Sequence, residues 1–185
     1  TRVYGVIGWP VGHSRSPSFH NAAFDHIGFD GVYLPLPVPD AWEHFKATVG
    51  AMLDHPGLDF RGASVTIPHK EHCVRLVRER GGRYSGLSDA LGAANTIAVE
   101  DDGTVCCANT DAPAIVASLL SAFPERKDLT GARVAILGAG GVARAAAGAV
   151  ALAGGSAVIV NRTAERAERL AEELNIGIGR VTAAS

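Results

Sequence analysis

A short glycine-rich segment in the second half of the chain constrains its fold more than any other feature. Gly138, Gly140 and Ala143 follow the apolar run Val134–Leu137 and precede an alanine-rich helical pattern. The first glycine of such a segment permits a tight turn, the second lets a ligand approach the backbone, and a small third residue lets the helix pack closely on the strand. The free N–H groups at the helix start favour an anion there. The segment therefore predicts a strand, turn and helix that bind a pyrophosphate.

The residues that follow the next predicted strand indicate which dinucleotide binds. An acidic residue there would contact the ribose 2′-hydroxyl of NAD. The sequence instead has Asn161, Arg162 and Thr163, and a guanidinium pairs well with a 2′-phosphate. We therefore expect NADP, although Thr163 is also suited to cap the following helix without any ligand. The expected cofactor contacts are Gly138, Ala139, Gly140, Gly141, Val142, Ala143, Asn161, Arg162 and Thr163, and Arg144 is a weaker phosphate candidate.

Short apolar runs alternate with helical patterns along the chain, which is typical of βαβ units around a mainly parallel sheet. The predicted strands are 3–8, 31–37, 62–66, 95–100, 105–108, 133–138, 157–160 and a third C-terminal strand at 178–182. The predicted helices are 17–27, 41–53, 70–80, 111–123, 142–153 and 164–174. Asp101, Asp102 and Gly103 predict a hairpin turn. The fold class is therefore α/β.

A polar, proline-containing break at 123–131 predicts two domains. We expect an α/β substrate-binding and catalytic domain over 1–124, in which 111–123 is a connecting helix. Residues 125–185 would form the N-terminal half of a Rossmann-type NADP-binding domain, because a complete doubly wound domain has roughly six strands. The chain is thus expected to be C-terminally truncated, with an incomplete and marginally stable second sheet.

Composition excludes several classes of protein. Hydrophobic residues make up 47% of the chain and charged residues 19%, with a formal net charge of −2, so the chain should be globular, without the basic field that nucleic acid binding needs. The most apolar stretch, 143–160, is broken by Arg144 and glycines and predicts no membrane span. Three cysteines without a Cys-x-x-Cys motif fit a reducing cytosol. A first residue other than Met suggests a processed, excised or fused chain.

Four polar segments lie at the ends of predicted strands, where open α/β sheets gather ligand groups. The first supplies the hydroxyls of Ser14 and Ser16, and the second supplies Thr66 and Lys70. The third supplies Asn95 and the fourth Asp111. Each has a simpler explanation. Ser16 and Asp111 could only cap helices, Lys70 could be a solvated surface residue, and Asn95 could belong to a turn. Together they form a set suited to a polyhydroxylated acid.

The order of these motifs carries a family resemblance. The segments are Gly8-Trp9-Pro10, His13-Ser14-Arg15-Ser16-Pro17, His20-Asn21, Val65-Thr66-Ile67-Pro68-His69-Lys70, Gly92-Ala93-Ala94-Asn95-Thr96, Asn109-Thr110-Asp111, the glycine segment and Asn161-Arg162-Thr163. This succession resembles the shikimate dehydrogenases. The resemblance implies reversible, NADP-dependent reduction of 3-dehydroshikimate to shikimate on the route to aromatic amino acids. The opening residues also look like the dehydrogenase half of a fused dehydroquinase-shikimate dehydrogenase.

The resemblance also implies roles for individual residues. Ser14 and Ser16 would bind the substrate carboxylate, while Thr66, Lys70, Asn95 and Asp111 would hold the ring hydroxyls and the reacting oxygen. Lys70 and Asp111 would form the catalytic pair. Family members continue beyond Ser185, so this chain alone is expected to bind poorly and turn over little. The alternatives are a quinate or dual quinate/shikimate dehydrogenase, and a catalytically silent ligand-binding fragment.

Overall fold

The computed structural model describes residues 1–184 and divides into two compact units. The first unit comprises Thr1–Ser85 and Ala94–Ala108, and the second comprises Gly86–Ala93 and the chain from Asn109 onwards. Within residues 1–184 no helix has the length and apolar character needed to cross a bilayer. Each unit has its own sheet and core, so each is described separately.

A six-stranded sheet organises the first unit. Its strands are β1 (Arg2–Gly8), β2 (Gly31–Pro37), β3 (Phe60–Val65), β4 (Arg83–Gly86), β5 (Thr96–Val99) and β6 (Val105–Asn109), in the order β2-β1-β3-β5-β6-β4. Strand β1 pairs in parallel with both β2 and β3. Strand β5 pairs antiparallel with β3 and with β6. The predicted hairpin between β5 and β6 is therefore confirmed.

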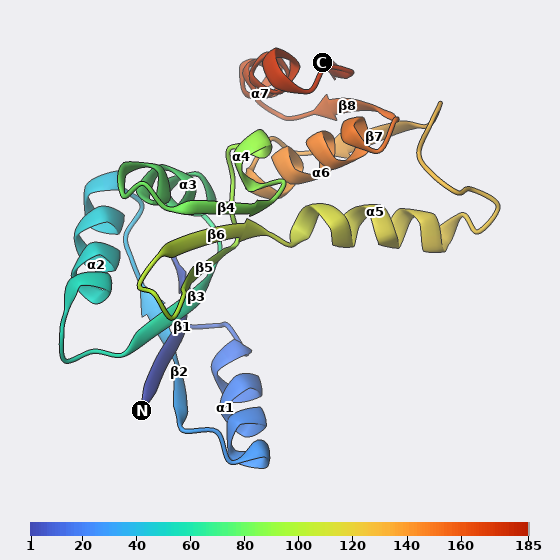
Figure 1. Ribbon diagram of the computed structural model, residues 1–185. Helices are drawn as coiled ribbons and strands as arrows, with labels where there is room; N and C mark the ends of the chain where they lie inside the picture. Colours follow the sequence, from blue (N-terminus) through green and yellow to red (C-terminus); the bar gives the residue numbers. More distant parts are fainter. Residues whose placement is uncertain (185) are drawn as a thin grey trace. The chain divides into compact units, whose positions relative to one another are not determined.

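Helices cover both faces of this sheet (Figure 1). They are α1 (Ser16–Ile27), α2 (Trp42–Asp54) and α3 (Lys70–Glu79). On one face Phe24 of α1 packs against Val6 and Tyr33. On the other face Phe45 of α2 and Val77 of α3 belong to the larger core of the unit. Alternation along β1 assigns successive residues to these two cores, because strand side chains point to opposite faces in turn.

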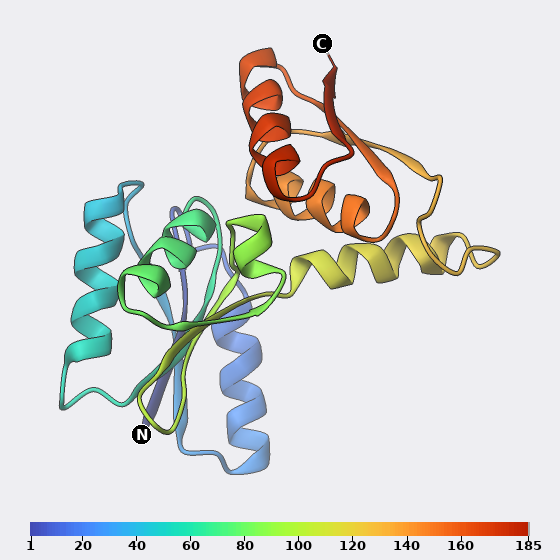
Figure 2. The same ribbon diagram turned by 45° about the horizontal axis from the view of Figure 1, so that its top comes forward.

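The second unit contains α4 (Ser88–Leu91), α5 (Asp111–Ala122), β7 (Arg133–Leu137), α6 (Gly141–Leu152), β8 (Ser156–Val160), α7 (Ala164–Gly177) and β9 (Val181–Ala184). Strands β7, β8 and β9 form a parallel sheet in that order. Figure 2 shows α6 and α7 beside these strands. Both helices contribute to a single core with Ala157 and Ile159 of β8. This strand order and parallel pairing match one half of a doubly wound fold.

The α/β class, with four parallel and two antiparallel strand pairings among those described, agrees with the prediction. Three local expectations differ from the structure. Strand β4 and the single-turn helix α4 were not predicted. The last strand begins at Val181 rather than at residue 178, because α7 continues to Gly177. Helix α5 packs on α6 and so belongs to the second unit, whereas the sequence placed 111–123 with the first domain.

Gly62 gives a stability test of the first unit. Its φ of +150° suits glycine, and an added Cβ would collide with the backbone oxygen of Ile97 on the paired strand β5. We expect Gly62→Ala to lower the free energy of unfolding by about 2–4 kcal/mol, since backbone strain and overpacking add. Urea unfolding followed by circular dichroism measures the change. Gly12→Ala is the control, because a Cβ there meets no atom of residues 1–184 within 4 Å.

Candidate functional site

Strand register in the first unit brings the predicted polar segments to one edge of its sheet. Ile7 of β1 lies opposite Val65 of β3, so the loops that follow these parallel strands leave from the same edge. The loops are joined there, since the Trp9 N–H donates to the Ile67 carbonyl at 2.9 Å. Strand β5 runs the other way and starts at this edge, where Asn95 accepts a backbone hydrogen bond from Val65 at 2.7 Å.

The two serines lie where the first of these loops enters α1. The helix begins at Ser16, and Arg15 occupies the N-cap position without a side-chain cap. Ser14 Oγ accepts a hydrogen bond from the Ser16 N–H at 3.3 Å. The alternative that Ser16 caps the helix is therefore wrong, because Ser16 is already its first residue. Both serines are only partly buried. They lie at the N-terminus of α1, and a helix N-terminus favours an anion.

Lys70 is a buried residue of the turn after β3, with 7% of its surface exposed. The His69 N–H donates to the Thr66 carbonyl at 2.9 Å and closes the turn, and Lys70 then begins α3. The Lys70 carbonyl accepts a hydrogen bond from the Ala94 N–H at 2.9 Å. The alternative of a solvated surface lysine is therefore wrong. The Lys70 residue is therefore largely withdrawn from solvent at this edge.

Backbone hydrogen bonds hold Thr66 and Asn95 in the sheet and its loops. The Thr66 N–H donates to Ile7 at 2.9 Å, and the Asn95 N–H donates to Ala108 of β6 at 3.0 Å. The Thr96 hydroxyl donates to Asn95 Oδ1 at 3.3 Å. Both side chains are partly buried. Ser14, Ser16, Thr66, Lys70 and Asn95 are thus brought to a common sheet edge, as the sequence predicted.

Asp111 belongs to the second unit, where it is the first residue of α5. The N-cap position is occupied by Thr110, so the alternative that Asp111 serves as the cap is wrong. The side chain that accepts a hydrogen bond from the first turn of α5 is that of Asn109, which is 3% exposed. Asn109 Oδ1 accepts from the Ala112 N–H at 3.0 Å, and its Nδ2 donates to the Ala93 carbonyl at 2.8 Å. Asn109 therefore holds the start of α5, and Asp111 does not serve as its cap.

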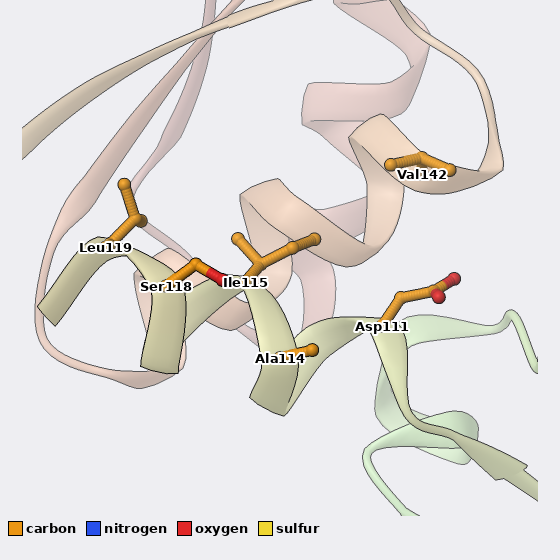
Figure 3. Close-up of a pocket in the computed structure, with 6 residues that line it drawn as sticks. All are labelled: Asp111, Ala114, Ile115, Ser118, Leu119 and Val142. Carbon is orange, nitrogen blue, oxygen red and sulfur yellow. The ribbon is translucent and has the colours of Figure 1, made fainter. Parts of the chain in front are cut away.

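A pocket of about 330 Å³ lies along α5, from Asp111 to Leu119, and reaches the start of α6 at Val142. Its lining residues, drawn in Figure 3, are Asp111, Ala114, Ile115, Ser118, Leu119 and Val142. Val142 belongs to the glycine segment, and the carboxylate of Asp111 stands at the end of α5 nearest to it. A predicted cofactor residue and a predicted catalytic residue therefore line one mostly apolar pocket of the second unit.

The glycine segment has the geometry of an anion-binding turn. Gly138 has a φ of +116°, and its N–H donates to the Val160 carbonyl at 2.7 Å. A Cβ added at Gly138 or at Gly140 would meet no atom of residues 1–184 within 4 Å, which leaves room for a ligand to approach the backbone. Ala143 is buried in the core. The first turn of α6 contains no acidic residue to oppose a phosphate.

The register of β7 and β8 places Arg162 at the same edge as the glycine segment, because Leu137 lies opposite Val160. Arg162 and Thr163 are exposed. Thr163 occupies the N-cap position of α7, without a side-chain cap hydrogen bond. Asn161 Nδ2 donates to the Thr163 carbonyl at 2.9 Å and so shapes the turn.

Arg144 is committed elsewhere. Its Nη2 lies 2.5 Å from Glu173 Oε2 of α7. This ion pair ties α6 to α7 and makes Arg144 a poorer phosphate ligand than Arg162.

Two residues of these loops have structural functions that sequence reasoning missed, Asn109 and His69. His69 is 0% exposed and precedes Lys70 directly. Each side chain bonds a backbone carbonyl from a remote segment, for which the sequence carries no signal. Among residues 1–184 no cluster of three or more His, Cys, Asp or Glu side chains is arranged to hold a metal ion.

Comparison with known proteins gives the same family in both halves of the chain. Residues 6–97 match the model described as the shikimate dehydrogenase substrate binding domain, and residues 121–182 match shikimate / quinate 5-dehydrogenase. A shikimate dehydrogenase (NADP(+)) of Paramagnetospirillum magneticum is 42% identical over 94% of this chain and 59% of the relative. The chain therefore spans about three fifths of the length of such relatives.

Solved structures agree. The shikimate dehydrogenase of Aquifex aeolicus superposes with a TM-score of 0.80 at 31% identity, covering 100% of this chain and 63% of that one. The Thermus thermophilus shikimate 5-dehydrogenase, solved in complex with NADP(H) and shikimate, gives 0.74 at 31% identity, with the same two coverages.

Asn109 offers a test of how the start of α5 is held. Asn109→Asp keeps an acceptor for the Ala112 N–H but loses the donor to the Ala93 carbonyl and buries a charge beside it. We expect the free energy of unfolding to fall by about 1–3 kcal/mol at neutral pH. The loss should shrink as the pH falls and the new carboxyl protonates. A free energy of unfolding equal to that of the wild type would contradict this role.

Proposed function

We propose that the complete protein catalyses the reversible NADPH-dependent reduction of 3-dehydroshikimate to shikimate, because the chain belongs to the shikimate dehydrogenase family. The observation that carries the proposal is Lys70, a buried lysine at a sheet edge that also holds two serine hydroxyls, a threonine and an amide. Such an edge suits a ring acid with several hydroxyls. The family models over both halves of the chain support the same reaction.

Ser14 and Ser16 would bind the substrate carboxylate. Their hydroxyls stand at the N-terminus of α1, where the helix dipole favours an anion. Thr66 and Asn95 would bind the ring hydroxyls, since each can both donate and accept hydrogen bonds. Their backbones are fixed by the sheet, which limits the entropy lost when substrate binds.

Lys70 and Asp111 are proposed as the catalytic pair. Reduction of a ketone builds negative charge on its oxygen, so an ammonium next to that oxygen stabilises the charge and donates the proton. In the reverse direction the amine takes the proton from the hydroxyl. Asp111 would accept a hydrogen bond from a substrate hydroxyl and orient the lysine.

The second unit fits NADP. The free space above Gly138 and Gly140 would accept the pyrophosphate at the N-terminus of α6. The exposed guanidinium of Arg162 would pair with the 2′-phosphate, assisted by Asn161 and Thr163. When bound, the nicotinamide supplies the hydride. The relatives named for NADP(+) support this choice over NAD.

A quinate or dual quinate/shikimate dehydrogenase is the second candidate, because the model matching residues 121–182 is described for both substrates. The paired serines and Arg162 favour shikimate with NADP. We also propose a cytoplasmic location, which the three unbridged cysteines support. A covalent fusion to a dehydroquinase domain is a further proposal, and it rests on the resemblance of the opening residues alone.

The test of the function is absorbance of the reduced nicotinamide while shikimate and NADP are mixed with the complete gene product. Quinate and NAD are assayed in parallel, and the 185-residue chain is assayed beside them. NADPH formation with shikimate alone supports the proposal. Activity with quinate moves it to the second candidate. A complete gene product that is silent with both acids, yet binds them, would instead be a ligand-binding protein.

Lys70→Ala tests the proton donor. We expect the turnover number to fall by about 10² or more, because a positioned acid-base group contributes that much. Steady-state assays in both directions measure it. Lys127→Ala, an exposed lysine outside both sheets, is the control and should retain full activity. If Lys70→Ala changed KM alone, Lys70 would be a binding residue.

Arg162→Asp tests cofactor choice. A carboxylate at this position should repel the 2′-phosphate and accept from a ribose hydroxyl, so the ratio of kcat/KM for NADP to that for NAD should fall by about 10²-fold or more. Arg166→Asp, on the exposed first turn of α7, is the matched charge change. An unaltered ratio in Arg162→Asp would refute the role assigned to this strand end.

A further inference from the structure

A pair of histidines lies against the turn that delivers Lys70. His69 is fully buried, and His72 of α3 is partly buried beside it. Their Nδ1 atoms are 3.0 Å apart, and His69 Nε2 lies 2.7 Å from the Val38 carbonyl oxygen. None of the roles described above uses either ring. A buried histidine bonded at both nitrogens has one fixed orientation.

The partners determine where the protons lie. The Val38 oxygen can only accept, so His69 Nε2 must carry the hydrogen. In the neutral ring Nδ1 is then an acceptor, and His72 Nδ1 must donate to it. With both imidazoles neutral, the two rings form a directed chain, from His72 Nδ1–H to His69 Nδ1 and from His69 Nε2–H to Val38.

This chain connects three loops at the edge where the sheet delivers its polar groups. Val38 follows β2, and its N–H donates to the Gly8 carbonyl at the end of β1 at 3.1 Å. His69 closes the turn after β3 through Thr66 and accepts the first helical bond of α3 from the Cys73 N–H at 2.9 Å. The hydrogen bonds of the His69 side chain thus hold the backbone directly before Lys70.

Aromatic rings hold the pair in place. The Phe45 centroid lies 5.0 Å from that of His69 and 5.8 Å from that of His72, and Trp42 lies 5.8 Å from His72. Burial, followed by the neighbouring His69, lowers the pKa of His72. Arg75 lowers it further, while Asp40 and Glu71 oppose the shift. The His72 ring is thereby kept neutral over a wider pH range.

We propose that His69, oriented by His72 and by the Val38 carbonyl, is a positioning residue that sets where Lys70 presents its ammonium to the substrate. The inference rests on the proposed function for the reaction that it serves. His69 does not touch the reacting atoms. Its effect is on turnover, because a displacement of about 1 Å of a catalytic group can cost up to about 10²-fold.

The test compares two substitutions of His72 in the complete gene product. His72→Leu removes the donor to His69, whereas His72→Asn places an amide N–H where Nδ1–H was. We expect His72→Leu to lower kcat about 5- to 20-fold, with the KM for shikimate within about twofold of the wild-type value. His72→Asn should restore kcat to within about twofold.

A second pair of variants tests His69 itself. His69→Gln keeps a donor to the Val38 carbonyl, and His69→Phe keeps only the ring volume. His69→Gln should retain more kcat than His69→Phe, with thermal unfolding measured on each. Equal kcat in His72→Leu, His72→Asn and wild type, while Lys70→Ala is inactive, would overturn the positioning role.

Nitrogen NMR of the wild-type imidazoles separates this inference from the proposed function, because it needs no substrate. The expected signals are Nε2–H for His69 and Nδ1–H for His72, the less common tautomer. The opposite pair of tautomers would overturn the proposal even in an active enzyme. The expected tautomers in a protein that does not oxidise shikimate would leave the histidine chain intact and remove the proposed function alone.

Discussion

Parallel pairing of β1 with β2 and β3 is the constraint on which the polar edge of the first unit depends. Parallel strands end on the same side of a sheet, so the loops that follow β1, β2 and β3 meet there whatever their sequences. Backbone hydrogen bonds then join the loops to one another, from Trp9 to Ile67 and from Val38 to Gly8. The edge is therefore organised by main-chain atoms.

The antiparallel strand β5 adds to this edge in the opposite sense. A strand antiparallel to β3 begins where β3 ends, so Asn95 arrives beside Val65 at the start of a strand. Lys70 has a less favourable place, because an ammonium at the start of α3 faces the positive end of the helix dipole. Glu71 in the same turn offsets part of that cost. Helix stability therefore does not account for a buried lysine in this position.

The sequence predicted the main elements well, because they follow from periodicity and from glycine and proline placement. Strand β4 is only four residues long and polar, and α4 is a single turn, so neither has a readable period. The start of β9 was misplaced because α7 does not end before Gly177, and the turn is completed at Arg180 with a φ of +59°. A positive φ at arginine has no sequence signal.

The difference between local sequence patterns and remote contacts also explains which parts of the site were predictable. Ser14, Lys70 and the glycine segment are motifs whose neighbours in the sequence already determine their surroundings. Asn109 and His69 act through carbonyls of Ala93 and Val38, sixteen and thirty-one residues away. Any residue offers a carbonyl, so only the fold reveals which one is used. Residues that act through such backbone partners are therefore harder to read from sequence than residues in local motifs, since topology determines which backbone atoms they meet.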